Sequence, residues 1–259
     1  MTITQWLAEN YQWKLSLISA VGILAGTLLS GWLAARIPTI GAAVRLNADT
    51  LAAKMEKPNY AANQKWNRKW AILFQIVIFL GILPFCLTRT LHSWPVMLRD
   101  MVVILMVYDF VYYLTHRFLF HDSGFFGGPL KWMHAVHHRQ HNPCRWDSSY
   151  IHPLEVAIGL GLYVGTTLVL SLVMGRFDVP TVIVTFIAFS QINLHNHNRW
   201  TADTFPWRYV AFLSRMHHNH HAKFTGGNYA TISLLYDWMF GTLDYGDEKR
   251  EPKGAAAAR

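Results

Sequence analysis

Histidines dominate the residues of this chain that could do chemistry. Thirteen of the fourteen lie between His116 and His221, and their spacing separates four clusters: His116 and His121; His134, His137 and His138; His195 and His197; and His217, His220 and His221. A neutral imidazole offers a nitrogen lone pair near physiological pH and is the commonest metal ligand in proteins. Since the chain has only two cysteines, we predict a nitrogen-rich site that can hold more than one metal ion.

Helical periodicity would bring several of these imidazoles together. Residues at positions i, i+3 and i+4 share one face of a helix, and the trios that begin at His134 and at His217 both have this spacing. Each trio could therefore direct its rings to one side. His116 and His121 are five residues apart, which is about 140° around an ideal helix. They converge only at a helix end or at a distortion.

Other polar residues in this region are secondary candidates. Asp109 precedes His116 by seven residues, and a carboxylate inside an apolar run is costly without a partner. We expect Asp109 to accept the N–H of a ligating histidine. Of the pair His195 and His197, His195 is the preferred ligand, because residues two apart on a helix seldom ligate the same ion. Roles beside the metal or the substrate are expected for His141, His152 and His218.

The apolar content of the chain places this site at a membrane. Hydrophobic residues make up 52% and charged residues 15% of the sequence, and the mean hydropathy is +0.16; this is typical of an integral membrane protein. Apolar runs cover residues 15–35, 71–87, 101–120, 156–174 and 179–194. Because backbone groups in lipid must be satisfied internally, these runs should be helices. We predict an all-α integral membrane protein with about four to five membrane-embedded helices.

The distribution of Lys and Arg orients these helices. If the five runs alternate in direction and the amino terminus lies outside, residues 36–70, 116–153 and 195–259 share one side with 19 of the 23 basic residues. The positive-inside rule assigns that side to the cytoplasm. All the clustered histidines lie on the same side. The sequence therefore predicts a cytoplasmic, histidine-rich metal-binding cap beneath the bilayer.

The same pattern divides the chain into three regions. Residues 1–108 form an N-terminal transmembrane and interfacial region, in which residues 36–70 are either an amphipathic segment on the membrane surface or a solvated linker. Residues 109–245 contain the histidine clusters and a helical hairpin at 154–194. Residues 246–259 are charged and then alanine-rich, which predicts a disordered tail.

The order of the motifs is more specific than any one of them. It reads Asp109-(x2)-Tyr112-Tyr113-(x2)-His116-Arg117-(x3)-His121, Leu130-x-Trp132-x-His134-(x2)-His137-His138, His152-Pro153-Leu154-Glu155, His195, His217-(x2)-His220-His221, Asn228-Tyr229 and Asp237-Trp238-Met239-Phe240-Gly241-Thr242. This order resembles the fatty acid hydroxylase/sterol desaturase superfamily. Tyr150, where an Arg is frequent, and Asn196, where a Ser is common, depart from the pattern on the substrate side.

The resemblance implies a membrane-embedded, non-haem di-iron oxygenase with residues 109–245 as its catalytic domain. Members of the superfamily use O2 and two electrons to hydroxylate or desaturate an unactivated C–H bond of a lipid. By motif match, the metal ligands would be His116, His121, His134, His137, His138, His195, His217, His220 and His221. Possible further ligands, or partners of ligands, are His197, His218, Asp109, His141, His152 and Asp237.

The electrons must come from another protein, because no flavin or nicotinamide motif occurs in the sequence. The basic cytoplasmic side would attract an acidic carrier, such as a cytochrome b5- or ferredoxin-like protein, by electrostatic steering. Positive-inside topology and anionic lipid also explain that charge. The expected partners are this carrier, a lipid substrate (a fatty acyl lipid or a sterol) and the bilayer. No nucleic-acid partner is expected.

Two other functions are compatible with a histidine-rich membrane protein. A metal transporter would place ionisable ligands at mid-membrane within broken helices, whereas these clusters follow the ends of the apolar runs. A zinc-dependent hydrolase would need a general base near the metal, and no H-E-x-x-H motif occurs. The identity of the lipid substrate stays open.

Overall fold

The protein is helical throughout the part of the chain that the computed structural model describes, residues 2–121, 124 and 126–246. Those residues form no strand, and one isolated bridge joins Leu87 to Phe177. The all-α prediction is therefore confirmed. The predicted disordered tail, 246–259, lies outside the described residues except for Gly246.

Twelve α-helices are accompanied by four short π or 3-10 helices in the described residues. In chain order the elements are α1 (Ile3–Asn10), α2 (Trp13–Ala34), α3 (Pro38–Met55), α4 (Pro58–Val77), the π-helix η1 (Ile78–Ile82), α5 (Leu83–Cys86), α6 (Trp94–Thr115), the π-helix η2 (His116–Phe120), α7 (Lys131–His134), the 3-10 helices η3 (His137–Arg139) and η4 (Arg145–Ser149), α8 (Pro153–Met174), α9 (Val179–Asn196), α10 (Trp207–Val210), α11 (Phe212–Ala222) and α12 (Leu235–Met239).

Local sequence signals set the ends of the long helices. Proline stands in the first turn of α3, α4, α6, α8 and α9, where its missing N–H would be unpaired anyway. Gly175 ends α8 with a φ of 93°, a backbone conformation that glycine adopts without steric cost. Asp178 then caps α9 by accepting the backbone N–H of Thr181 at 2.9 Å. The connection between α8 and α9 is therefore short, as predicted.

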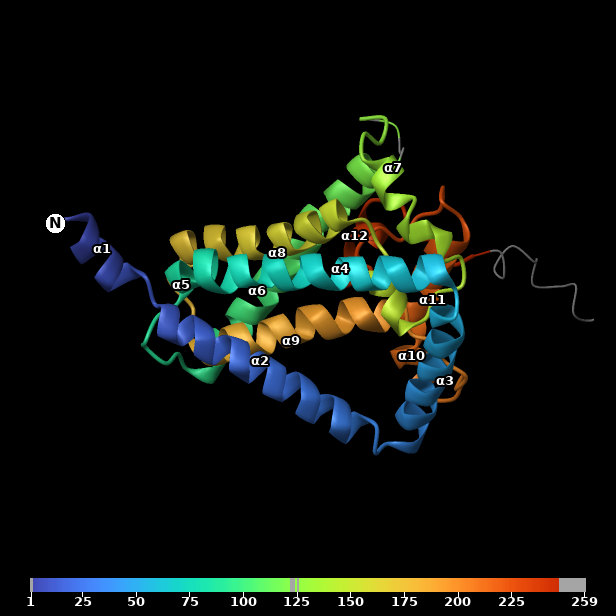
Figure 1. Cartoon of the computed structure of the whole chain (residues 1–259), viewed down its shortest axis with the longest axis horizontal. Helices are drawn as coiled ribbons and strands as arrows, with labels where there is room; N and C mark the ends of the chain where they lie inside the picture. Colours follow the sequence, from blue (N-terminus) through green and yellow to red (C-terminus); the bar gives the residue numbers. More distant parts are fainter. Residues whose placement is uncertain (1, 122–123, 125, 247–259) are drawn as a thin grey trace, which may run out of the picture.

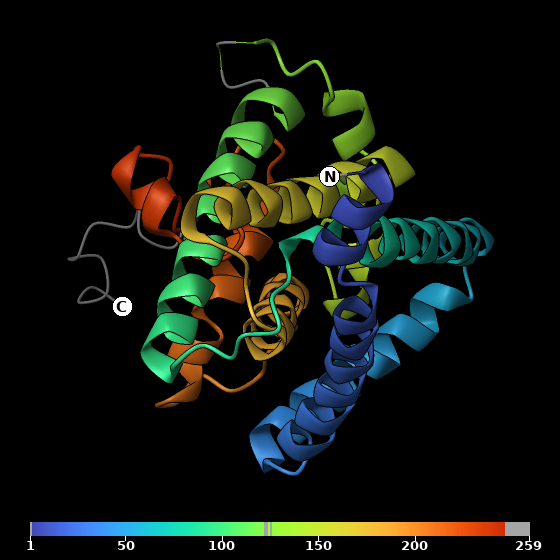
Figure 2. The ribbon, with the colours of Figure 1, turned by 90° about the vertical axis from the view of Figure 1, so that its left-hand side faces the viewer.

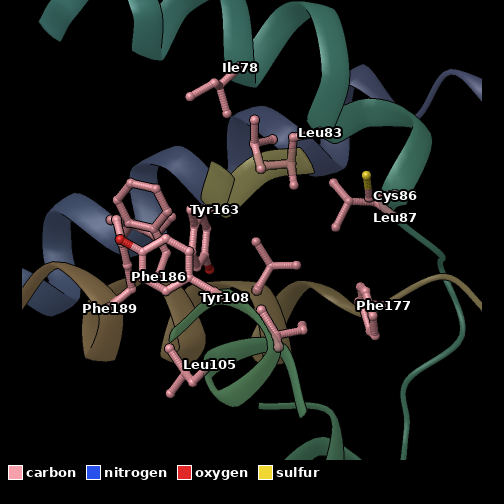
Figure 3. Packing of buried hydrophobic residues seen from close by; sticks show 14 of the residues in the cluster. Ile78, Leu83, Cys86, Leu87, Leu105, Tyr108, Tyr163, Phe177, Phe186 and Phe189 are labelled. Atoms are coloured by element: carbon pink, nitrogen blue, oxygen red, sulfur yellow. The ribbon is translucent and has the colours of Figure 1, made fainter. Parts of the chain in front are cut away.

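The core lies where α6 packs against both α8 and α9. Tyr163 of α8 stacks on Phe189 of α9 with 4.2 Å between ring centroids, and Tyr108 of α6 meets the edge of Phe189 at 5.0 Å. Figure 3 shows these rings with Phe186 in one cluster. Seen from the end at which α1 lies, α6 and α8 cross at a wide angle (Figure 2). Aromatic contacts thus fix the helices that lead to the histidine clusters.

The outer helix faces are apolar and exposed. Val21, Leu24 and Leu28 of α2 are 62–68% exposed, and Leu172 and Val173 of α8 are 78–79% exposed. A soluble protein rarely exposes such a surface, and a lipid bilayer would cover it. In the part of the chain that the structure describes, three helical segments are long and apolar enough to cross a membrane: Ile3–Ala34, Pro58–Cys86 and Pro153–Met174. The predicted runs in α6 and α9 are not in this set, so the count of four to five embedded helices stays a prediction.

The molecule has two distinct ends (Figure 1). At one end Arg89 donates to Gln12 at 3.1 Å and Arg176 contacts Asn10. At the other end Asn47 of α3 accepts the backbone N–H groups of Arg145 at 2.9 Å and Arg199 at 3.0 Å. The second end gathers α3, the segment after α6 and the segment after α9, which the basic residues had assigned to one side.

The segment 36–70 combines two structures rather than one. Its first part is α3, an 18-residue helix that contacts η4. Its last part belongs to α4, which begins at Pro58 and continues into the second apolar run. The predicted start of that run at residue 71 is therefore thirteen residues after the helix begins.

Candidate metal centre

The clustered histidines form two compact groups at the end of the molecule that holds α7 and α11. The first histidine group is His116, His121, His134, His138 and His220; the second histidine group is His137, His197, His217 and His221. Within each group the ligand nitrogens all lie within 4.8 Å of one another. None of the nine side chains is more than 9% exposed. The chain thus builds two nitrogen-lined sites, out of contact with bulk water.

Each H-x2-H-H trio contributes to both groups. In the trio that begins at His134, the i and i+4 rings enter the first group and the i+3 ring, His137, enters the second. In the trio on α11 the assignment is reversed, so that His220 enters the first group, and His217 and His221 enter the second. The prediction that each trio faces one side is therefore wrong in detail. The two trios instead tie the two groups together.

A π-turn brings His116 and His121 into the same group. Residues 116–120 form the π-helix η2, in which the N–H of His121 donates to the carbonyl of His116 at 3.0 Å. A π-turn joins residues five apart, whereas an α-helix would leave them on different faces. The expected distortion is thus present. The two ring centroids lie 5.0 Å apart.

Backbone carbonyls fix the orientation of several imidazoles. Nδ1 lies 2.7 Å from the carbonyl oxygen of Tyr229 in His116, 2.7 Å from that of Phe224 in His121, and 2.7 Å from that of Gly227 in His220. In the second group, Nδ1 of His197 lies 3.1 Å from the carbonyl oxygen of Asn193. A carbonyl can only accept, so each Nδ1 donates. In a neutral ring this leaves the Nε2 lone pair free to bind a cation.

Glu155 performs the same task for His134, and sequence reasoning did not assign it a role. Its Oε1 lies 2.7 Å from Nδ1 of His134, and both side chains are buried. A signal was available, since Glu155 is a carboxylate at the start of an apolar run, directly after His152-Pro153-Leu154. The cost of an unpaired carboxylate, applied to Asp109, holds for Glu155 too.

The distances between Nε2 atoms fit a bound cation. They are 3.0 Å between His116 and His134 and 3.1 Å between His138 and His220 in the first group. In the second group they are 3.1 Å between His137 and His197 and 3.0 Å between His197 and His217. Nitrogens at right angles around an ion, each about 2.1 Å from it, are about 3.0 Å apart. Unprotonated nitrogens at this distance repel each other unless a cation separates them. Two metal ions would fit this donor set.

Burial keeps these imidazoles neutral. Desolvation lowers the pKa of His121 to about 4 and that of His137 to about 4. It also lowers the pKa of His217, His220 and His221 well below the usual value, and neighbouring histidines add to the effect. A buried ring disfavours the charged form, so at neutral pH the lone pairs are available for a metal.

The structure places His197 rather than His195 in a histidine group. Nε2 of His195 lies 2.7 Å from the carbonyl oxygen of Val210, and His195 belongs to neither group. His197 is the C-cap residue that follows α9, and its ring lies between His137 and His217. The two residues sit at a helix end, where a spacing of two sends their rings to opposite sides.

The other predicted histidines lie beside the two groups. His141 approaches the carbonyl of His221 with its Nδ1 at 3.4 Å. His152 caps α8 by accepting the N–H of Leu154 at 3.2 Å. The ring of His218 is partly exposed and lies outside both groups. These placements agree with a role outside the ligand set.

Asp109 and Asp237 support the loop after α11, not a histidine directly. Asp109 accepts the backbone N–H groups of Thr231 and Ile232, both at 2.8 Å. Asp237 accepts those of Tyr229 and Ala230, both at 2.8 Å. The predicted bond from a histidine to Asp109 is therefore wrong. Both carboxylates act on the histidines indirectly. They hold this loop in place, and the carbonyl of Tyr229 in the loop accepts the N–H of His116.

A second support holds the loop that orients His137. Asp147 is fully buried and contacts Lys54 of α3 and the hydroxyl of Tyr60 on α4, the latter at 2.6 Å. Tyr60 stacks on Tyr150 with 5.0 Å between centroids. The carbonyl of Tyr150 lies 3.3 Å from Nδ1 of His137. The last turn of α3, which carries Lys54, and the first turn of α4, which carries Tyr60, thus position a ring of the second group.

A cavity of about 950 Å³ reaches both groups. Its histidine wall is formed by His116, His134, His137, His197 and His217. Its other walls are mostly apolar and come from α3, α4, α6, α8 and α9, with Tyr108, Leu160 and Phe189 among them. A cavity of this size and lining accommodates an apolar ligand, and it brings that ligand against the histidines.

Comparison with known proteins points to one family. Residues 101–242 match the model of the family described as fatty acid hydroxylase. The chain is 30% identical over 161 residues to a putative methylsterol monooxygenase of Dictyostelium discoideum. The aligned region covers 59% of this chain and 54% of the relative. It is 29% identical over 168 residues to a very-long-chain aldehyde decarbonylase of Oryza sativa subsp. indica, which covers 61% of this chain and 58% of the relative.

A methylsterol monooxygenase of Arabidopsis thaliana is 27% identical over 168 residues, which covers 59% of this chain and 58% of the relative. The chain thus spans a little over half the length of the curated relatives that it matches. No solved structure matches it. The matched region includes all nine histidines of the two groups.

Proposed function

Because the chain belongs to the fatty acid hydroxylase family, we propose that it is a membrane-bound, non-haem di-iron oxygenase that oxidises an unactivated C–H bond of a lipid. The observation that supports this proposal most directly is the pair of buried histidine groups at the end of an apolar cavity. The matched relatives include two methylsterol monooxygenases. Hydroxylation is the proposed outcome, with desaturation as the variant that the same site would support.

The proposed metal ligands are the nine histidines of the two groups, with His197 in place of His195. Bound iron would supply an oxidant able to break an aliphatic C–H bond, given O2 and two electrons. The protein's own residues hold and orient the Nε2 atoms, and Glu155 and the backbone carbonyls fix the rings. Phe224 covers His121 and His138, with its ring centroid 4.6 and 4.9 Å from theirs, and helps to exclude water.

The alternatives receive less support from the geometry. A transporter would need ligands along a path through the membrane, whereas both groups lie together at one end of the helices. A hydrolase would need a carboxylate free to act as general base. Glu155 is the one acidic residue among those that line the cavity; its Oε1 is bonded to Nδ1 of His134 and orients that ring, and its buried Oε2 has no hydrogen-bond partner among the described residues.

We further propose that the histidine end lies in the cytoplasm, where a separate acidic carrier would deliver the electrons. The support is the position of basic residues. Arg139, Arg208 and Arg215 belong to the histidine end, on η3, α10 and α11. Electrostatic steering by such residues speeds association with an acidic partner.

The first test is metal content per chain in protein purified in detergent from iron-supplemented cells. We expect about two irons per chain, and fewer in His137→Ala. Lipids from cells with and without the gene would then be compared by mass spectrometry for a gain of one oxygen or a loss of two hydrogens. A single zinc per chain under iron-supplemented conditions would overturn the di-iron proposal.

A further inference from the structure

Two cationic side chains line the cavity on α4. Lys65 and Arg68 are three residues apart, share one helix face, and both belong to the cavity wall. Both are exposed, and neither makes a hydrogen bond or ion pair within the described part of the chain. The neighbouring basic residue, Lys69, is exposed as well but does not line the cavity. Lys65 and Arg68 thus lie where a ligand in the cavity can contact them, whereas Lys69 does not.

The cavity offers these cations no acidic partner. Among the residues that line it, Glu155 is the one carboxylate; its Oε1 is bonded to His134, and its buried Oε2 makes no hydrogen bond or ion pair with Lys65 or Arg68 within the described residues. Two other buried acids at this end are also bonded, since Asp147 contacts Lys54 and Asp237 binds backbone N–H groups. The positive charge of Lys65 and Arg68 is therefore available to a ligand in the cavity.

Arg68 lies near the histidine end of the helices that line the cavity. The preceding residue, Asn67, donates its side-chain amide to the carbonyl of Ile151, just before α8 begins. Arg68 therefore lies beside the start of α8, at the histidine end of the helices. The apolar wall formed by Tyr108, Leu160 and Phe189 comes from interior positions of α6, α8 and α9. The cavity thus has a cationic side on α4 and an apolar wall on α6, α8 and α9.

We propose that the substrate is an acyl lipid with an anionic headgroup, a carboxylate or a phosphate, which Lys65 and Arg68 bind at the mouth of the cavity while the chain lies along its apolar wall. This inference rests on the proposed lipid oxygenase activity and narrows its substrate class. Guanidinium and ammonium groups pair strongly with such anions. A neutral sterol would leave both cations without a partner.

The test is equilibrium binding of radiolabelled single-chain probes to the full-length protein in nanodiscs of neutral phosphatidylcholine. Palmitate and hexadecyl phosphate carry the two anionic headgroups, and hexadecanol has the same chain without a charge. We expect both anions, or one of them, to bind about tenfold more tightly than hexadecanol, which is the scale of a charge-assisted hydrogen bond. The tighter anion identifies the headgroup chemistry.

The double variant Lys65→Gln with Arg68→Gln should lose about tenfold in affinity for the anionic probe and less than twofold for hexadecanol. Lys69→Gln is the matched control and should change neither. The charge-reversed pair Lys65→Glu with Arg68→Glu should bind hexadecylamine in preference to palmitate. Equal binding of palmitate and hexadecanol by the wild type would overturn the proposal. An equal loss of affinity for the anionic probe in the double variant and in Lys69→Gln would also overturn the proposal, because it would indicate that surface charge in general attracts the probe.

These outcomes are separate from those of the proposed function. Binding requires no turnover, and metal content is measured on the same preparations. We expect the Lys65 and Arg68 variants to keep the metal content of the wild type, since neither residue contacts a histidine group. Headgroup selectivity without bound iron would support the substrate inference and contradict the oxygenase proposal. Bound iron without headgroup selectivity would support the oxygenase proposal and contradict the substrate inference.

Discussion

At the scale of single residues, the six imidazoles of the two H-x2-H-H trios are divided equally between the two histidine groups, three in each. Spacing favoured His195 as the ligand, whereas the structure places His197 in the second histidine group. Both residues lie at the end of α9, so the path of the chain after the helix decides which ring turns inward. Glu155 was missed as a partner because it stands at the start of an apolar run and not inside one.

The placement of His197 gives the first prediction. His197→Ala should lower the metal content by about one ion per chain, because it removes one of the four imidazoles of the second group. His195→Ala should leave the metal content unchanged, because its ring bonds to the carbonyl of Val210. Elemental analysis of both purified variants decides between them. Loss of metal from His195→Ala alone would contradict the assignment.

Glu155 gives a second prediction at this scale. Glu155→Ala removes the acceptor that orients His134, and such changes typically weaken metal affinity by about 10- to 100-fold. Competition with a chelator would measure this loss. Glu56→Ala is the control, since Glu56 is an exposed residue at the end of α3. If chelator competition does not distinguish the two variants, Glu155 does not support the first group.

At the scale of elements, the apolar runs predicted the long helices α2, α6, α8 and α9. They could not predict the short elements at the site. The π-turn at 116–120 is accompanied by a tertiary contact from His116 to the carbonyl of Tyr229, more than a hundred residues later. No local pattern encodes that contact. The same is true of the loop 227–233, which is held by Asp109 and Asp237 and has no helical or strand periodicity of its own.

Gly227 makes the role of that loop testable. A Cβ at this position would lie 1.7 Å from the carbonyl oxygen of Thr242, so the backbone must move in Gly227→Ala. The carbonyl of Gly227 also holds His220. We expect a loss of about 1–3 kcal/mol in stability and a weaker first group. Thermal unfolding and chelator competition would measure the two effects. Gly161→Ala, where a Cβ meets nothing within 4 Å, should show neither.

At the scale of the whole molecule, nine buried imidazoles make stability depend on pH. Burial lowers the pKa of His121 and of His137 to about 4, below the value of about 6.5 for an unfolded chain. Between these values the unfolded state binds more protons, so stability falls as pH falls. The contribution of these rings is fully present above pH of about 6.5 and is lost toward pH of about 4.

We therefore expect the metal-free protein to unfold at a lower temperature at a pH of about 5.5 than at about 7.5. The double variant His121→Gln with His137→Gln should show a smaller difference between the two conditions, and His92→Gln, which lies at the other end, should keep it. A pH dependence that is unchanged in the double variant would contradict the argument, because it would mean that groups other than these rings set it.

The two ends of the molecule carry the last prediction. The basic residues suggested that residues 36–70, 116–153 and 195–259 share one side, and the structure brings α3, η2 and α11 to one end (Figure 1). Sequence could predict this because charge and apolar length set topology, although three segments among the described residues are long and apolar enough to cross a membrane. Which end faces the cytoplasm is tested by labelling.

Thr90 lies in the exposed loop at the α1 end, and Thr201 lies in an exposed loop at the histidine end. Both native cysteines, Cys86 and Cys144, are fully buried, so background labelling should be low. We expect a membrane-impermeant maleimide to label Thr90→Cys in intact cells and Thr201→Cys only after permeabilisation. The opposite pattern would reverse the orientation and remove the cytoplasmic electron carrier from the proposal. Labelling of both in intact cells would mean that the helices between them do not separate two compartments.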